Sequence, residues 1–263
     1  MSRRPTAVND EFDEIPYSGK ERRNSNKRSV KQASGCERTI KPKFEEEREL
    51  PPLRPMNDKQ ARYMQLLTDK KLVVATGYAG TSKTYIPTVM ACDAYRRGLI
   101  NKIFLCRPAM SESKSLGYFA GDLETKAKHW LLPVLSIMYE RLGKDVVEIA
   151  IRCGDIQFIP METIKGMSFS KGTFVIVEEC EDVTVKEAKS ILTRQGGGTM
   201  VLAGDIGQSA LNEKSGLKFI VDMIAKYPEL EKTTGVIDFN DVDDIVRSKE
   251  CKAWIVAMSK EKV

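Results

Sequence analysis

The stretch from Leu72 to Tyr85 constrains this chain more than any other, because an apolar run breaks there into a glycine-bearing loop that restarts at Lys83-Thr84. Where a helix follows such a loop, its amides and those of the loop converge on an anion, and the helix dipole adds roughly half a positive charge. The pattern therefore predicts a cradle for the phosphates of a nucleotide. An ordinary strand-to-helix turn is the alternative.

The predicted cradle has the form G-x-x-x-x-S-K-T. Lys83 is expected to contact the β- and γ-phosphates of ATP, and the hydroxyl of Thr84 is expected to bind the Mg²⁺ that accompanies them. Ser82 departs from the usual pattern, which has glycine before the lysine, and this makes rapid turnover less expected. The nucleotide-binding residues expected here are Gly77, Tyr78, Ala79, Gly80, Thr81, Ser82, Lys83, Thr84 and Tyr85.

Charge divides the 263-residue chain into two parts. Residues 1–43 hold 11 Lys/Arg and 6 Asp/Glu, whereas the remainder holds 31 of each, so the tail carries the whole net charge of +5. Residues 1–50 show no helical or strand period and are predicted to be a disordered basic tail, with residues 51–263 as a single domain. The basic cluster at residues 20–31 is either a nucleic-acid phosphate contact or a solvated linker.

Composition also bears on location and on metal chemistry. No apolar run approaches the roughly 18 residues of a membrane span, and the N-terminus lacks an apolar signal core, so we expect no membrane association and a cytoplasmic location, that of the host if the gene is phage-encoded. The six cysteines form no C-x-x-C pair and His129 is the only histidine, which argues against zinc. Free thiols in a reducing compartment are favoured over disulfides.

Beyond the hinge at Leu50–Pro55, segments of strand and helix alternate, starting with a helix at residues 60–67 capped by Asn57-Asp58. This order predicts a mostly parallel sheet covered by helices on both faces. Pro87 is expected to kink the second predicted helix, and Pro133 to bend the next long one. The predicted strands are 71–76, 102–106, 156–159, 173–177, 199–203 and 235–239; the predicted helices are 60–67, 83–97, 123–142, 185–194, 216–227 and a helical ending from Asp241.

Two acids end the buried strand at 173–177. Glu178 is expected to be the metal carboxylate, and Glu179 the general base or water-orienting group. The alternative is the solvated start of a loop. A further strand ends in Asp205 and Gln208; Gln208 is expected to sense the γ-phosphate, while Asp205 is as readily the cap of a turn.

In its order of motifs the chain resembles the PhoH family of phosphate-starvation-inducible P-loop proteins, related to the superfamily-one helicase core. The likeness covers roughly residues 57–250. It rests on Arg107-Pro108-Ala109 with Leu116–Lys126, on Glu178–Asp182, on Gly204–Gln208 and on Asp244–Arg247, and departs from the family at Ser82, Glu178, Glu181 and Lys165. The middle signature, 116–126, is the most specific.

This resemblance implies a RecA-like domain that assembles as a homo-oligomeric, hexameric ring with ATP at subunit interfaces. It also implies that Gln60 lies on the adenine side and that Arg107 or Arg247 reaches a phosphate, where the alternative for each arginine is a structural ion pair. The expected function is a Mg²⁺-dependent ATPase acting on RNA or another single-stranded nucleic acid. Two other functions stay open: a nucleotide-binding assembly protein with little hydrolysis, and a nucleic-acid-binding module that uses the basic tail.

Overall fold

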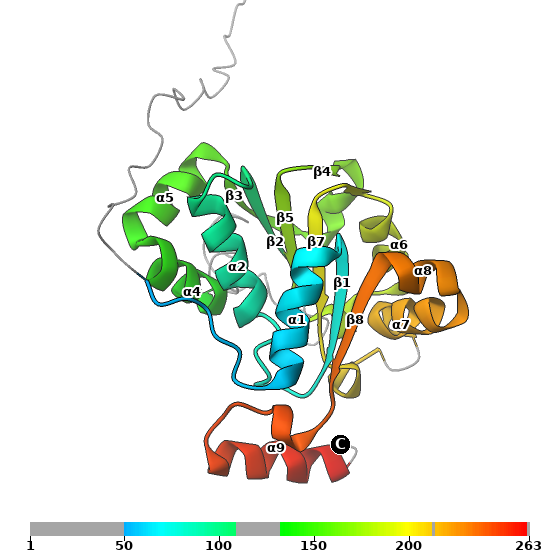
Figure 1. Ribbon diagram of the computed structural model, residues 1–263. Coiled ribbons are helices and arrows are strands. Elements are labelled where there is room, and N and C mark those ends of the chain that lie inside the picture. The colour runs from blue at the N-terminus through cyan, green and yellow to red at the C-terminus, as the bar shows by residue number, and fades with distance from the viewer. Residues whose placement is uncertain (1–49, 109–131, 212–213, 262–263) are drawn as a thin grey trace, which may run out of the picture. The chain divides into compact units, whose positions relative to one another are not determined.

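Six parallel strands form the central sheet of the protein (Figure 1). The structure is a computed structural model that describes residues 50–108, 132–211 and 214–261, and all structural statements below concern those residues. The strand order is β3-β2-β5-β7-β1-β8. The strands are β1 (Leu72–Gly77), β2 (Lys102–Arg107), β3 (Ile156–Pro160), β5 (Thr173–Val177), β7 (Thr199–Ala203) and β8 (Thr234–Phe239).

Both faces of the sheet are buried, because successive residues of a strand point to opposite faces and both sets are apolar here. In β1, Val73 and Ala75 pack into one core and Val74 into the other. The first core lies under α1 (Asp58–Asp69), α2 (Tyr85–Arg96), α4 (Leu132–Leu142) and α5 (Lys144–Cys153). The second lies under α6 (Val185–Leu192) and α7 (Gly216–Lys226).

Shorter elements link these layers. A small second sheet pairs β4 (Phe169–Ser170) with β6 (Gln195–Gly196), and α8 (Pro228–Thr233) leads into β8. The short 3₁₀ helices are η2 (Met161–Gly166), η3 (Cys180–Asp182), η4 (Ile206–Gln208) and η6 (Val242–Asp244), and α9 (Lys249–Glu261) closes the described chain.

The fold class predicted from the sequence, a RecA-like α/β P-loop domain with a parallel sheet, is confirmed, and every predicted strand lies within one residue of its observed bounds. The helical ending predicted from Asp241 begins only at Lys249, because η6, which Asp241 caps at its start, ends after one turn at Ile245, whose backbone is extended. Helix α5 was not predicted, although Gly154 marks its end in the left-handed conformation.

Several predictions fall outside the described residues: the basic tail with its cluster at 20–31, the signature at 116–126, and the first part of the helix predicted at 123–142. Among the helices that are described, none is long and apolar enough to span a membrane.

Candidate nucleotide site

The phosphate loop, residues 77–84, joins β1 to α2 at the carboxyl edge of the sheet. It starts against the end of β8: the amide of Tyr78 donates to the carbonyl of Phe239 at 3.0 Å. A Cβ on Gly77 would lie 2.4 Å from the carbonyl carbon of Phe239, and φ there is +115°. Only glycine fits this close approach of two backbones.

Ser82, the departure from the P-loop pattern, is one of two described non-glycine residues with positive φ, at +71°. An L-residue in this left-handed region costs about 1–2 kcal/mol. The position that usually carries glycine thus requires a glycine-like backbone, and the chain keeps that backbone with a serine.

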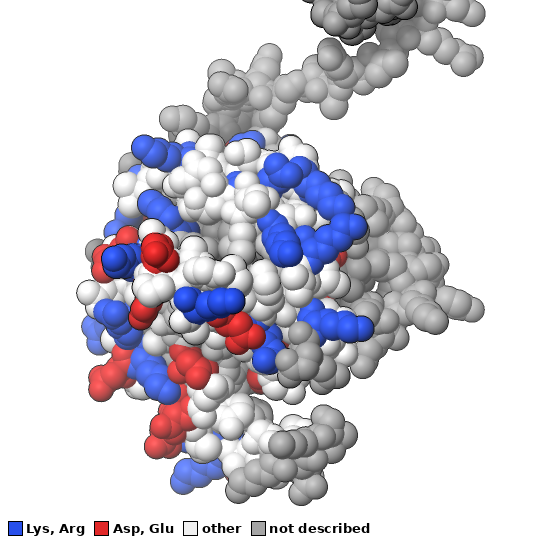
Figure 2. Space-filling view, turned by 90° about the vertical axis from the view of Figure 1, so that its right-hand side faces the viewer, with Lys and Arg blue, Asp and Glu red and all other residues white. Residues whose placement is uncertain are grey.

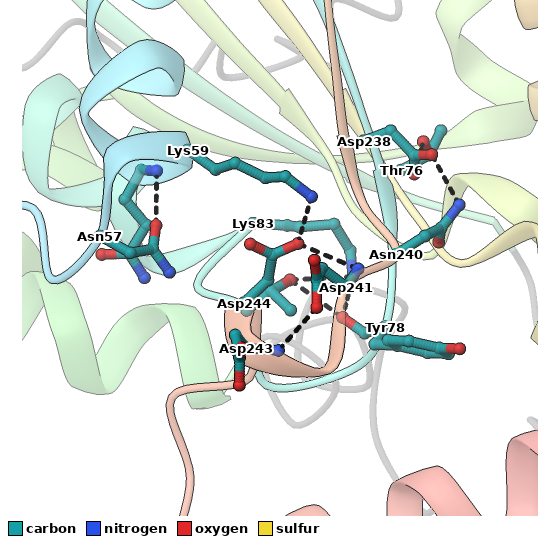
Figure 3. A network of polar contacts seen from close by, with 12 residues as sticks. Asn57, Lys59, Thr76, Tyr78, Lys83, Asp238, Asn240, Asp241, Asp243 and Asp244 are labelled. Atoms are coloured by element: carbon teal, nitrogen blue, oxygen red, sulfur yellow. Dashed lines mark hydrogen bonds and ion pairs between the residues drawn. The ribbon is translucent and has the colours of Figure 1, made fainter.

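The side chain of Lys83 folds back into the loop (Figure 3). Its ammonium donates to the carbonyls of Gly77 at 2.5 Å and Tyr78 at 2.6 Å. Burial lowers the pKa of Lys83, while the surrounding carboxylates, Asp205 first among them, act in the opposite direction. The lysine therefore sits in the centre of the cradle with anionic groups facing it.

A buried tyrosine from α1 holds the end of the loop. The hydroxyl of Tyr63 donates to the carbonyl of Lys83 at 2.9 Å. In a regular helix that carbonyl would accept the amide of residue 87, which is Pro87 and has no N–H. The kink predicted at Pro87 is absent, because α2 starts at Tyr85 and the proline lies in its first turn, and Tyr63 replaces the missing donor.

The segment after β8 covers the other side of the loop. The amide of Val246 donates to the carbonyl of Gly80 at 3.0 Å, and a Cβ on Gly80 would lie 2.7 Å from Cγ of Arg247. Asp244 anchors this segment through an ion pair with Lys59 at 2.6 Å, within the polar network of Figure 3. Arg247 is thus held against the phosphate loop of its own chain.

The acidic loop, residues 178–184, follows β5 at the same edge of the sheet. Glu178 is buried beside Thr84; burial raises its pKa to about 6, and the Thr84 hydroxyl and Arg107 oppose the rise. Glu179 has φ +49° and its carboxylate lies 3.3 Å from the guanidinium of Arg107. Glu178 therefore contacts the phosphate loop, whereas Glu179 contacts Arg107 at the end of β2.

Glu181 is a third carboxyl in this loop, which the sequence analysis noted only as a departure. It is buried, its Oε2 accepts the amide of Asp205 at 3.1 Å, and burial together with a hydrogen bond to Glu179 raises its pKa to about 8. Its backbone carbonyl accepts the hydroxyls of Ser209 and Ser215, both at 2.8 Å. Glu181 thus fixes the acidic loop to the segment after β7.

Asp205 performs the capping role that was one of its two predicted roles. Its Oδ1 accepts the amide of Gly207 at 3.0 Å and its Oδ2 accepts the side-chain amide of Gln208 at 2.9 Å. Burial raises the pKa of Asp205, and Lys83 acts against that rise. Gln208 itself is exposed.

A cavity of about 730 Å³ joins the two loops. The residues predicted for the site that line it are Ala79, Gly80, Thr81, Ser82, Lys83, Thr84, Tyr85, Glu178, Glu179, Gln208 and Arg247. Four other predicted residues do not line it: Gly77 and Tyr78, whose carbonyls bind Lys83, Arg107, which meets Glu179, and Gln60. Met56, Pro133, Ile137 and Glu181 also line it, and none of the four was predicted as a site residue.

Gln60 is buried next to Met56, which lines the cavity. The backbone amide of Met56 donates to Oε1 of Gln60 at 2.9 Å. Its Nε2 is a buried donor with no hydrogen-bond partner among the described residues. Buried donors are rarely left unpaired. A ligand with an acceptor, such as the edge of a purine, would satisfy it.

The residues present fit both groups that the sequence predicts. The loop amides, Lys83 and Arg247 suit a triphosphate, and the Thr84 hydroxyl beside the Glu178 carboxylate is a pair of hard oxygen donors of the kind that Mg²⁺ prefers. Glu178 and the phosphate loop line one cavity, so a single ligand can contact both.

Comparison with known proteins places the chain in a family. The model for PhoH-like proteins matches residues 52–259. Protein PhoH of Escherichia coli K12 is 30% identical over 217 residues, which cover 81% of this chain and 60% of that protein. A PhoH-like protein of Bacillus subtilis is 35% identical over 168 residues, covering 63% of this chain and 52% of the relative. The chain thus spans less than two thirds of the length of either relative.

Solved structures are more distant. The large terminase of a thermophilic bacteriophage, in complex with ADP, aligns with a TM-score of 0.42 at 11% identity, covering 76% of this chain and 49% of the terminase. A Bacteroides Pif1 bound to single-stranded DNA aligns with a TM-score of 0.40 at 12% identity, covering 80% of this chain and 47% of Pif1. Because the family model matches most of this chain, and because the chain has the P-loop geometry described above, the chain belongs to the PhoH family.

Proposed function

We propose that this protein is a Mg²⁺-dependent ATPase. One observation carries the proposal: Lys83, Thr84, Glu178 and Glu179, drawn from two loops far apart in the sequence, line a single cavity, and Thr84 meets Glu178 within it. A lysine, a hydroxyl and two carboxylates at one site are the groups that phosphoryl transfer to water requires.

In this proposal each residue has a distinct role. Lys83 exchanges its loop carbonyls for β- and γ-phosphate oxygens when ATP binds, and Gln60 contributes its unpaired Nε2 to the adenine. Thr84 and Glu178 would hold Mg²⁺, which when bound supplies positive charge at the phosphates. Glu179 orients the attacking water and accepts its proton, with Arg107 fixing the carboxylate.

Two further side chains complete the proposed site. Arg247 lies against Gly80 and reaches the phosphates from the same chain, where it neutralises charge in the transition state. Gln208, held by Asp205, senses the γ-phosphate. Assembly into a homo-oligomeric ring, coupling to RNA or single-stranded DNA and a cytoplasmic location belong to the same proposal, and rest on the family resemblance.

The test compares ATP binding and hydrolysis in wild type, Lys83→Ala and Glu179→Gln. Lys83→Ala is expected to weaken ATP binding by at least about tenfold, since it removes the cation inside the loop, and Glu179→Gln to bind ATP normally but hydrolyse it about 10²-fold or more slowly. Lys144→Ala, an exposed lysine on α5, is the matched control. Equal hydrolysis rates in all four proteins would exclude the assignment.

A second function, ATP binding with little hydrolysis that controls assembly, is favoured by the strained Ser82 and by the ion pair that engages Glu179. Tight ATP binding and a nucleotide-dependent change in solution mass, without turnover when RNA is added, would select it over the ATPase.

A further inference from the structure

A group of lysine and arginine side chains gathers on one part of the face on which α6 and α7 lie, and acidic side chains lie elsewhere on that face (Figure 2). We call Lys165, Lys171, Lys186, Lys189 and Arg194 the basic surface; they come from η2, the turn between β4 and β5, α6 and the residue before β6. None of the five lines the nucleotide cavity. This surface is therefore a feature that the proposed ATP site does not use.

Backbone contacts bring these segments together. The amide of Phe169 donates to the carbonyl of Arg194 at 2.9 Å, and β4 pairs with β6. Lys171 lies over Gly197, because a Cβ there would be 3.1 Å from its Cγ. Helix α6, which carries Lys186 and Lys189, packs on η2, which carries Lys165. Segments that are separate in the sequence thus contribute cations to one face.

These cations are not neutralised by the described part of the chain. No described carboxylate forms an ion pair with any of the five, and residues 162–177 and 185–204, which carry all five cations, hold only two acids, Glu162 and Glu187. The nearby Glu187 is occupied in the capping box of α6 with Thr184. Arg194 is half-buried, and its Nε has no hydrogen-bond partner among the described residues. The surface therefore carries unbalanced positive charge.

The chemistry of the surface favours a polyphosphate over a membrane or an apolar protein partner. The large exposed apolar side chains of the described chain are Met56, Tyr85, Leu99, Leu132, Tyr227, Leu230, Val236, Val242, Trp254 and Met258, and none belongs to this surface. A membrane-binding surface combines cations with apolar or aromatic residues that enter the bilayer. The aromatic ring that Lys189 covers at 5.4 Å, Phe219, is half-buried. Lysines without exposed apolar residues suit the regularly spaced phosphates of a nucleic acid.

We infer that the basic surface binds the phosphate backbone of a nucleic acid, in a salt-sensitive and sequence-independent manner. This deepens the proposed function and rests on it for one step, the coupling to ATP: α6, which bears Lys186 and Lys189, begins at Val185, directly after the acidic loop with Glu178 and Glu179. A shift of that loop with the nucleotide state would move two of the contacts.

The test uses the full chain with the triple variant Lys165→Gln, Lys171→Gln and Lys186→Gln, all exposed residues. The matched control removes the same charge elsewhere, from α5, α1 and the end of α2, as Lys144→Gln, Arg62→Gln and Arg97→Gln, also exposed. Binding of a fluorescent oligo(dT) or oligo(U) is followed by anisotropy over a range of salt concentrations. The N-terminal tail is present in all three proteins, so any contribution from it cancels.

The triple variant is expected to bind the oligonucleotide about tenfold more weakly than the control at low salt. The plot of log K against log salt is expected to become less steep by about 2, since three phosphate contacts are lost and each one on a single strand contributes roughly 0.7 to the magnitude of the slope. Identical affinity and slope in the triple variant and the control would overturn the inference, as would binding to anionic lipid vesicles with none to the oligonucleotide. ATP binding, measured on the same proteins, separates this result from a failure of the proposed function.

Discussion

The phosphate loop and the acidic loop face the same cavity, and each turns through a non-glycine residue in the left-handed region, Ser82 in one and Glu179 in the other. They differ in what holds them. The phosphate loop is held by the two ends of the described chain, through Tyr63 of α1 and Val246 beyond β8. The acidic loop is held by its neighbour, the segment between β7 and α7, through Ser209 and Ser215.

The difference indicates where strain is needed. Glu179 must bring a carboxylate into the cavity, so the placement of its side chain explains why its backbone adopts the left-handed conformation. Ser82 contributes a hydroxyl that makes no described side-chain hydrogen bond, so its backbone alone is required. Strained residues that persist at functional sites are held by their surroundings. Three substitutions test whether the two loops are independent units held in these different ways.

The largest effect is expected at Tyr63. Tyr63→Phe leaves the buried carbonyl of Lys83 without a donor and should lower the free energy of unfolding by about 1–3 kcal/mol, with weaker ATP binding. Pro87→Ala supplies an amide N–H to that same carbonyl, so the double variant should recover most of the loss, while Pro87→Ala alone has little effect. Denaturant titration of all four proteins gives the coupling; additive effects would show that Tyr63 acts through packing alone.

A smaller, pH-dependent effect is expected in the acidic loop. Burial raises the pKa of Glu181 to about 8, from 4.5, so between these pH values the unfolded chain has lost a proton that the folded chain keeps. Wild-type stability should therefore fall as pH rises through this window, and Glu181→Gln should abolish that part of the fall. Glu178, whose pKa is also raised, is present in both proteins and its effect cancels.

Thermal unfolding near the two ends of this window, at about pH 5 and about pH 8, measures the difference. Because Glu181 and Glu179 are hydrogen-bonded and titrate as a pair, part of the pH dependence belongs to Glu179 and remains in the variant, and we expect the substitution to remove about 1 kcal/mol of it. The Tm of Glu181→Gln relative to wild type should therefore rise by about 3 °C between the two, since 1 kcal/mol shifts Tm by about 2–4 °C in a chain of this size. A constant difference at both pH values would show that Glu181 does not hold a proton in the folded state.

The smallest effect is expected at Ser82. Ser82→Gly relieves the left-handed strain of about 1–2 kcal/mol but restores backbone freedom to the unfolded chain, so a net gain of about 1 kcal/mol is expected. ATP affinity should be unchanged or stronger. A matched Ser190→Gly variant in the interior of α6 should instead destabilise the protein, and a loss of stability in both would contradict the strain at Ser82.

The sequence was informative wherever a local pattern sets the structure. Short apolar runs predicted all six strands of the central sheet within one residue, because a fully buried parallel strand needs apolar side chains on both faces. Helix ends were less well predicted: α5 was missed, and Pro87 was taken as an interior helix position because two residues of the loop were assigned to α2.

The candidate site divides in the same way. Lys83 and Thr84 follow from the strand–loop–helix pattern, and Glu178 and Glu179 from their place after a buried strand. The roles of three other residues were not predicted, because each forms a hydrogen bond with a segment far away in sequence: Glu181 with the amide of Asp205, Tyr63 with the carbonyl of Lys83, and Val246 with the carbonyl of Gly80. The proline at position 87 was the available signal for Tyr63, since it leaves a helix carbonyl without its usual donor.

By itself, the sequence determined which local segments form and which chemical groups each loop carries, because strand, turn and helix preferences act over a few residues. Tertiary structure alone decided that the phosphate loop and the acidic loop share one cavity, with β7 between their strands, and that cations from η2, α6 and β4–β6 gather on another face. Strand order and packing bring together residues tens of positions apart, and no local preference encodes that choice.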